Sequence, residues 1–150
     1  KTVGVFVNEE IEKVINICNS QIIDMVQLHG DEKDDYIKEL KKYVSNKIIK
    51  AVRVKGPEDV KKAMEFSSDF LLFDSYQGKE YGGTGKTFDW SVITGINKPF
   101  FLAGGINCCN VTHAIESCNP YSIDVSSGVE TNGYKDPKKI MDIIAAVRQT

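Results

Sequence analysis

Hydrophobic positions along the chain follow two alternating patterns. Short apolar runs of strand length recur at residues 3–7, 25–28, 48–52, 70–73, 100–103 and 123–125. Between them, around residues 11–18, 60–64, 111–118 and 140–147, apolar residues recur at the i, i+3, i+4 and i+7 spacing of an amphipathic helix. Asp136-Pro137 predicts a helix start, because an aspartate cap followed by proline is typical there. Residues 78–99 are less periodic and predict only a short helix around 90–93.

Strands that alternate with helices six times predict parallel pairing with right-handed crossovers. The two architectures of this kind are an open doubly wound sheet and a closed eight-stranded barrel. A complete barrel needs at least about 200 residues, so a chain of 150 residues holds about two units fewer than a closed barrel. We therefore weigh an open sheet against an incomplete barrel of six βα units.

Polar or glycine residues follow nearly every predicted strand. His29, Arg53, Asp74, Gly104 and Ser126 all stand directly after, or within a residue of, an apolar run. Barrels carry their active sites at the carboxyl ends of all strands, whereas an open sheet concentrates such residues at one switch point. This distribution favours the (β/α)8 TIM barrel. We expect an α/β fold in one domain, residues 1–150, formed as an incomplete barrel of six βα units.

Two segments after neighbouring strands have the residues of a phosphate site. Gly104-Gly105 follows the run at 100–103, and Ser126-Ser127-Gly128 follows the run at 123–125. Small residues let backbone N–H groups approach an anion closely, and such groups near a helix start favour negative charge. The sequence therefore predicts one phosphate cradle built from two loops, and a phosphorylated metabolite as the ligand.

Composition narrows the class of protein further. Hydrophobic residues make up 41% and charged residues 27%, which is typical of a globular domain. The formal net charge of −2 provides no broad basic surface, so we expect neither nucleic acid nor a membrane as a partner. The four cysteines lack the spacing of a zinc site, which predicts reduced thiols, no metal and a cytoplasmic location.

Six segments, in this order, resemble the phosphoribosylanthranilate isomerase family. They are residues 1–8, 26–30, 73–74, 81–90, 103–107 and 124–130, which read KTVGVFVN, VQLHG, FD, YGGTGKTFDW, AGGIN and DVSSGVE. The resemblance implies a (β/α)8 barrel of which this chain supplies strands 3–8, the C-terminal three-quarters, without the first two βα units. It also implies an isomerisation in tryptophan biosynthesis that needs no cofactor. The phosphosugar N-(5'-phosphoribosyl)anthranilate becomes 1-(2-carboxyphenylamino)-1-deoxyribulose 5-phosphate by an Amadori-type aldose–ketose rearrangement.

The resemblance also implies roles for strand-end residues. Asp74 corresponds to the general acid, although a helix cap or turn is its structural alternative. His29 is expected to contact the anthranilate or ribose part of the substrate. Asp124 is expected near the ribose and the amine, or else paired with Lys50 or Arg53. Arg53 either adds positive potential at the barrel mouth or is a solvated strand-end charge.

A glycine-rich segment between the fourth and fifth apolar runs invites a nucleotide-binding interpretation. A phosphate-binding loop of that kind needs glycine five positions before Gly85, where Glu80 stands. The resemblance implies instead a mobile loop that closes over the substrate. The residues expected in this loop are Gly82, Gly83, Thr84, Gly85 and Lys86.

The resemblance leaves the reaction without its base. In the family the base is a cysteine in a Cys-Gly-Ile motif at the end of the first strand, and an arginine comes from the second βα unit; this chain has neither. Cys18 and Cys118 lie on helical apolar stripes and predict packing roles, and Cys108 and Cys109 match no catalytic position. We therefore expect the 150-residue chain alone to be inactive or very weak.

Other functions stay open at this point. One is another phosphosugar barrel enzyme, such as indole-glycerol-phosphate synthase or a histidine-pathway isomerase. Another is a non-catalytic phosphate-ligand-binding fragment or assembly subunit, because the base is missing. The strands around Val5 and Ile123 are expected to have unpaired edges, which recruit other strands. The chain is therefore expected to form a homo-oligomer or to bind a complementing N-terminal segment.

Overall fold

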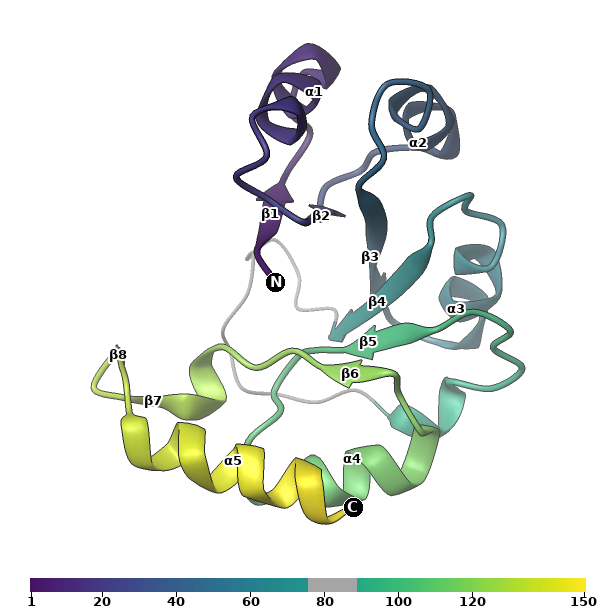
Figure 1. The fold of residues 1–150 in the computed structure, drawn as a ribbon. Coiled ribbons are helices and arrows are strands. Elements are labelled where there is room, and N and C mark those ends of the chain that lie inside the picture. Colours follow the sequence, from purple (N-terminus) through teal and green to yellow (C-terminus); the bar gives the residue numbers. More distant parts are fainter. Residues whose placement is uncertain (76–88) are drawn as a thin grey trace.

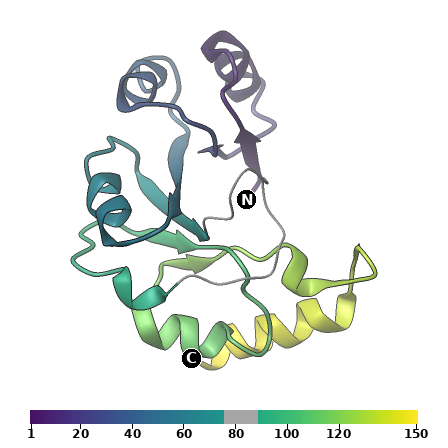
Figure 2. The ribbon, with the colours of Figure 1, turned by 180° about the vertical axis from the view of Figure 1, so that it is seen from behind.

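Six parallel strands form one curved sheet whose spatial order is the chain order, β1-β2-β3-β4-β5-β6. The computed structural model describes residues 1–75 and 89–150. The strands are β1 (Val3–Phe6), β2 (Met25–Leu28), β3 (Lys47–Val54), β4 (Phe70–Ser75), β5 (Phe100–Leu102) and β6 (Ser122–Ile123). Figure 1 and Figure 2 show the sheet curling, with helices around its outer side. The predicted parallel α/β architecture is confirmed.

Five α-helices cover the outer face in the described part of the chain. They are α1 (Ile11–Asn19), α2 (Asp34–Leu40), α3 (Pro57–Ala63), α4 (Val111–Cys118) and α5 (Pro137–Gln149). Two single 3-10 turns, η1 (Trp90–Val92) and η2 (Ser127–Val129), and a small hairpin of β7 (Glu130–Thr131) and β8 (Tyr134–Lys135) complete the fold. Within residues 1–75 and 89–150, no helix has both the length and the apolar character needed to cross a membrane.

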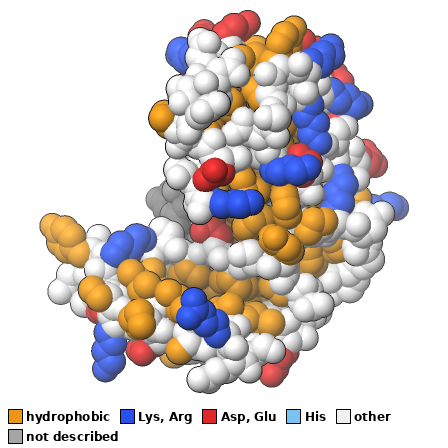
Figure 3. Space-filling model, viewed as in Figure 1, with side chains coloured by type: hydrophobic (Ala, Val, Ile, Leu, Met, Phe, Trp, Pro, Cys, Tyr) orange, Lys and Arg blue, Asp and Glu red, His pale blue; other side chains and the backbone are white. Residues whose placement is uncertain are grey.

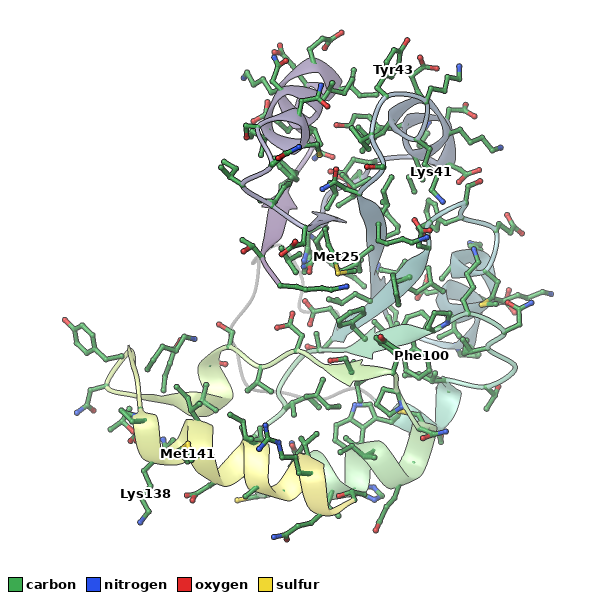
Figure 4. All side chains as sticks on the ribbon, in the orientation of Figure 1. Met25, Lys41, Tyr43, Phe100, Lys138 and Met141 are labelled. Atoms are coloured by element: carbon green, nitrogen blue, oxygen red, sulfur yellow. The ribbon has the colours of Figure 1, made fainter. Side chains whose placement is uncertain are left out.

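The strands have apolar residues on both faces because helices cover one face and the sheet curls around the other. On β4, Leu71 and Phe73 pack outward with α3 and α4, whereas Leu72 packs inward with Met25 and Ile49. This alternation follows from the period of two along a strand. Figure 4 labels Met25 in the hollow of the sheet. The hollow is therefore lined by apolar side chains, among them the rings of Phe70 and Phe101.

Helix boundaries follow local capping chemistry. The Asp136 carboxylate accepts hydrogen bonds from the backbone N–H groups of Lys138 (2.9 Å) and Lys139 (3.3 Å), and Pro137 occupies the first turn of α5. The helix start predicted at Asp136-Pro137 is thus confirmed. Such a cap stabilises a helix by about 1 kcal/mol relative to alanine.

Three details of the sequence prediction were wrong or incomplete. β6 is shorter than the predicted 123–125, because the backbone turns after Ile123 toward η2. α2 was not singled out, since only Ile37 and Leu40 are buried on this short helix. The hairpin β7–β8 was also missed; its turn uses the left-handed backbone of Asn132 (φ 54°) and Gly133 (φ 80°).

Candidate active site

Loops at the carboxyl ends of the strands enclose a cavity of about 510 Å³. Parallel strands bring these ends to one edge of the sheet, so residues far apart in sequence meet there. The residues that line it are Val5, Val7, His29, Arg53, Asp74, Ser75, Ala103, Gly104, Gly105, Ile106, Asp124, Ser126, Ser127 and Gly128. Within the described part of the chain, every strand-end residue that was predicted to belong to the site thus lines this cavity.

His29 and Asp74 are in direct contact in this cavity. The Nε2 atom of His29 lies 3.3 Å from Oδ2 of Asp74, and the two side chains are 21% and 18% exposed. Arg53 pairs in register with Asp74 across β3 and β4, so its side chain starts from the adjacent strand. Asp74 is therefore held by a neighbouring side chain and still reaches solvent, as a proton donor to a ligand requires.

Asp124 lies at the mouth of the same cavity, where β6 ends. Asp124 is exposed to solvent at the mouth, but the protein atoms around its carboxylate reduce its hydration and raise its pKa, and the negative charge of Asp74 raises it further. Electrostatic interactions with His29 and Lys135 oppose this increase. Two carboxyl groups thus face one ligand volume, and the charge of Asp74 disfavours the ionisation of Asp124, an arrangement suited to proton transfer.

Glycines shape the two loops of the predicted phosphate cradle. Gly104 (φ 84°) and Gly105 (φ 69°) have left-handed backbone that L side chains rarely adopt. A Cβ on Gly104 would lie 2.6 Å from Oδ1 of Asp74, and a Cβ on Gly128 would lie 1.9 Å from the carbonyl oxygen of Ile106. Only glycine lets these loops pack against each other and against the candidate acid.

The residues that carry the backbone donors of these loops line the cavity. The N–H groups of Gly105, Ser127 and Gly128 donate no hydrogen bond to an acceptor within residues 1–75 and 89–150. Lys135, which sequence reasoning missed, donates from Nζ to the carbonyl oxygen (3.0 Å) and Oγ (3.3 Å) of Ser126. Its ammonium therefore adds positive charge beside the cradle, although the hairpin that brings it there has no strong sequence signal.

A buried ion pair anchors the loop that follows β2. Lys50 Nζ lies 2.9 Å from Glu32 Oε2, with the two side chains 4% and 2% exposed, and also donates to the Gly30 carbonyl oxygen (2.7 Å). Burial alone would raise the pKa of Glu32, but hydrogen bonds from Lys50 and from the Asn8 N–H hold it below its ordinary value. Lys50 is thus the partner of Glu32, and the alternative pairing of Asp124 with Lys50 was wrong.

None of the four cysteines lines the cavity. Cys18 is buried in the core, and burial raises the pKa of Cys118 to about 11. Cys108 and Cys109 are exposed on the turn before α4. The expected loop residues Gly82, Gly83, Thr84, Gly85 and Lys86 lie outside the residues that the structure describes.

The chain matches a known protein family. Residues 1–146 match the family described as N-(5'phosphoribosyl)anthranilate (PRA) isomerase. The chain belongs to this isomerase family. An N-(5'-phosphoribosyl)anthranilate isomerase from a Thermoanaerobacter species is 50% identical over 150 residues, which cover 99% of this chain and 72% of the relative.

Solved structures of the isomerase family agree with the fold. The phosphoribosylanthranilate isomerase from Thermotoga maritima superposes with a TM-score of 0.84 at 38% identity, covering 99% of this chain and 73% of that one. A second isomerase, solved in complex with reduced 1-(o-carboxyphenylamino)-1-deoxyribulose 5-phosphate, gives a TM-score of 0.80 at 34% identity and covers 99% and 71%. Six parallel strands thus correspond to about three-quarters of each isomerase chain.

Proposed function

We propose that this chain carries the acid and the phosphate grip of a phosphoribosylanthranilate isomerase. The reaction converts N-(5'-phosphoribosyl)anthranilate into 1-(2-carboxyphenylamino)-1-deoxyribulose 5-phosphate in tryptophan biosynthesis. The observation that carries the proposal is the single cavity in which Asp74 faces the glycine loops at 104–105 and 126–128. One ligand with a phosphoryl end and a sugar ring reaches both.

The chemistry begins with a proton from Asp74. Protonation of the furanose oxygen breaks the bond between that oxygen and the anomeric carbon, while the nitrogen lone pair forms a carbon–nitrogen double bond. A base then removes the proton from the neighbouring carbon, and the resulting enolamine rearranges to the ketone. Each acid or base step typically contributes 10²–10⁴-fold. His29 and Asp124 lie beside Asp74, where they contact the ribose and the amine, and Arg53 adds positive potential at the mouth.

The phosphate group occupies the cradle. The N–H groups of Gly105, Ser127 and Gly128 donate to its oxygens, and Lys135 adds a positive charge that is partly neutralised by Glu130 at 2.6 Å. Binding energy from this remote group holds the reacting carbon next to Asp74, which is how enzymes use the non-reacting parts of a substrate.

The six βα units correspond to strands 3–8 of an eight-stranded barrel and form one domain. Each border strand of the sheet, β1 and β6, has one neighbour among the described residues. Beside β6, a groove of about 830 Å³ runs along α5 and is lined mainly by apolar side chains such as Ile123, Ile140 and Ile144; Figure 3 shows the hydrophobic band there. These edges and this groove suit two further βα units, which in the family bring the base cysteine and an arginine. A cytoplasmic location fits the four free thiols.

Turnover of N-(5'-phosphoribosyl)anthranilate tests the proposal. The assay compares the 150-residue chain alone with the chain mixed with the first two βα units of a relative. We expect conversion only in the mixture, and a large loss with Asp74→Asn but none with Asp142→Asn, a matched change on the exposed face of α5. Phosphosugar binding without turnover in the mixture would favour the non-catalytic alternative. Full activity of the chain alone would overturn the account of the base.

A further inference from the structure

Gln27 is a polar side chain in an otherwise apolar strand. Its neighbours in β2 pack into the cores, and Gln27 itself is only 8% exposed. Met25 lies in the inner cluster, so residues two and four positions further along the strand point to the same side of the sheet. Gln27 and His29 therefore project together into the hollow, toward the cavity that holds Asp74.

The hydrogen bond between Gln27 and His29 has a defined direction. Nε2 of Gln27 lies 2.8 Å from Nδ1 of His29. An amide nitrogen only donates, so Nδ1 must accept and carries no proton. A neutral imidazole then has its proton on Nε2, the atom that lies 3.3 Å from Oδ2 of Asp74. We propose that Gln27 is a positioning residue that fixes the tautomer of His29, so that Nε2–H donates to Asp74.

The backbone that carries the ring of His29 is held independently of Gln27. The backbone N–H of His29 donates to the Phe6 carbonyl oxygen (2.8 Å). The next residue, Gly30, donates its N–H to Glu32 (3.0 Å) and accepts from Lys50 (2.7 Å) at its carbonyl oxygen. Because these contacts do not involve Gln27, loss of the Gln27 amide should leave the backbone of His29 in place.

Together with the proposed function, on which this step rests, the direction of the His29–Asp74 hydrogen bond decides which oxygen of Asp74 carries the acidic proton. With Oδ2 of Asp74 accepting from His29, the proton that the acid transfers is held on Oδ1. That oxygen borders Gly104, since a Cβ there would lie 2.6 Å from it. Gln27 therefore directs the acidic proton toward the side of the cavity where the phosphate loop begins, without touching the substrate.

Nitrogen NMR of the histidine rings tests the tautomer directly, because the chain has only two histidines. The spectra are recorded at a pH of about 8. We expect a protonated Nε2 and an unprotonated Nδ1 for His29 in the wild-type chain, with H113Q identifying the other ring. A protonated Nδ1 in the wild-type chain would overturn the proposal, and this result requires no variant at Gln27 to fold.

Two substitutions extend the test. Gln27→Glu supplies an acceptor and should place a proton on Nδ1 of His29, whereas Gln27→Met supplies neither donor nor acceptor and should leave a mixture. Gln149→Glu, the same change on the exposed end of α5, should leave the His29 signals unchanged. An unchanged tautomer in folded Gln27→Glu and Gln27→Met would contradict the proposal.

A kinetic measurement connects the tautomer to the reaction. In the active mixture, Gln27→Met should lower kcat about 2- to 12-fold with little change in KM, the effect expected from one lost hydrogen bond. An unchanged kcat would show that the tautomer has no part in the reaction. If the wild-type mixture does not turn over, the proposed function fails, but the NMR result still decides the role of Gln27.

Discussion

Removal of the buried ammonium of Lys50 is the most informative perturbation of the fold around the site. Lys50→Met retains most of the apolar stem but deletes the ammonium, which lies 5.8 Å from the centre of the Phe66 ring and 2.9 Å from Glu32. It also deletes the donor to the Gly30 carbonyl oxygen. Among the described residues, Glu32 then keeps the backbone N–H donors of Asn8 and Gly30 and becomes an uncompensated buried carboxylate.

The magnitude follows from the burial of this pair. Breaking a buried ion pair by removing one partner typically costs about 3–5 kcal/mol, because the other charge stays desolvated. A domain of this size has a total stability of about 5–15 kcal/mol. The expected loss is therefore about a fifth or more of the stability, and it corresponds to a fall in Tm of about 6–20 °C.

Urea denaturation followed by circular dichroism measures the effect. The double variant Lys50→Met/Glu32→Gln should recover at least about 1 kcal/mol relative to Lys50→Met, because the stranded charge is gone. Lys42→Met, which removes an exposed partner of Glu39, is the matched control and should leave the midpoint unchanged.

The pH dependence separates a stranded charge from lost packing. In the wild-type chain the pKa of Glu32 is lowered, so its stabilising contribution is present above the unfolded value of 4.5 and is lost as the pH falls through the folded pKa. In Lys50→Met the carboxylate is unpaired, so its penalty should shrink when low pH protonates it. A penalty that is equal at pH 7 and pH 4, or a double variant no more stable than the single one, would refute this reasoning.

Three further predictions concern the cavity. Asp74→Asn should lower kcat about 10²–10⁴-fold in the active mixture with little change in KM, as measured by steady-state kinetics; a change in KM alone would argue against an acid role. Gly128→Ala places a Cβ 1.9 Å from the Ile106 carbonyl oxygen. It should weaken the binding of reduced 1-(o-carboxyphenylamino)-1-deoxyribulose 5-phosphate at least about tenfold in calorimetry. An unchanged Kd would show that residues 126–128 do not bind the phosphate. Asp124 has a raised pKa, so ionising it opposes folding once the pH rises above its unfolded value of 3.8. Asp124→Asn should therefore raise stability at neutral pH and lose this gain near pH 3 in denaturant titrations, and a gain that persists at pH 3 would have another origin.

Much of the architecture could be predicted from the sequence because parallel strands obey strict geometric rules. Apolar runs gave the strands, and right-handed crossovers bring the residues after each strand to the same edge. His29, Asp74 and Asp124 could therefore be expected near one another without knowledge of any side-chain conformation. The helix start at Asp136 was equally predictable, since a cap depends only on neighbouring residues.

Contacts that depend on strand register and side-chain direction could not be predicted. Lys50 lies on the same face of β3 as Ile48, which packs against the outer helices. Its ammonium therefore contacts Glu32 on the outer side of the sheet and not Asp124 at the mouth of the cavity. The contact of Gln27 with His29 requires the same knowledge of which face each residue occupies. Lys135 reaches Ser126 only because a two-stranded hairpin folds back, and that hairpin has strands of two residues each.

The central claim is that one ligand bridges the phosphate loops and Asp74. Amide and carboxyl NMR shifts of the chain, recorded during titration with reduced 1-(o-carboxyphenylamino)-1-deoxyribulose 5-phosphate, test it most directly. We predict that the amides of Gly105, Ser127 and Gly128 and the carboxyl carbon of Asp74 shift together with one binding constant. Shifts confined to the apolar groove along α5, or a cradle that responds while Asp74 does not, would contradict the account.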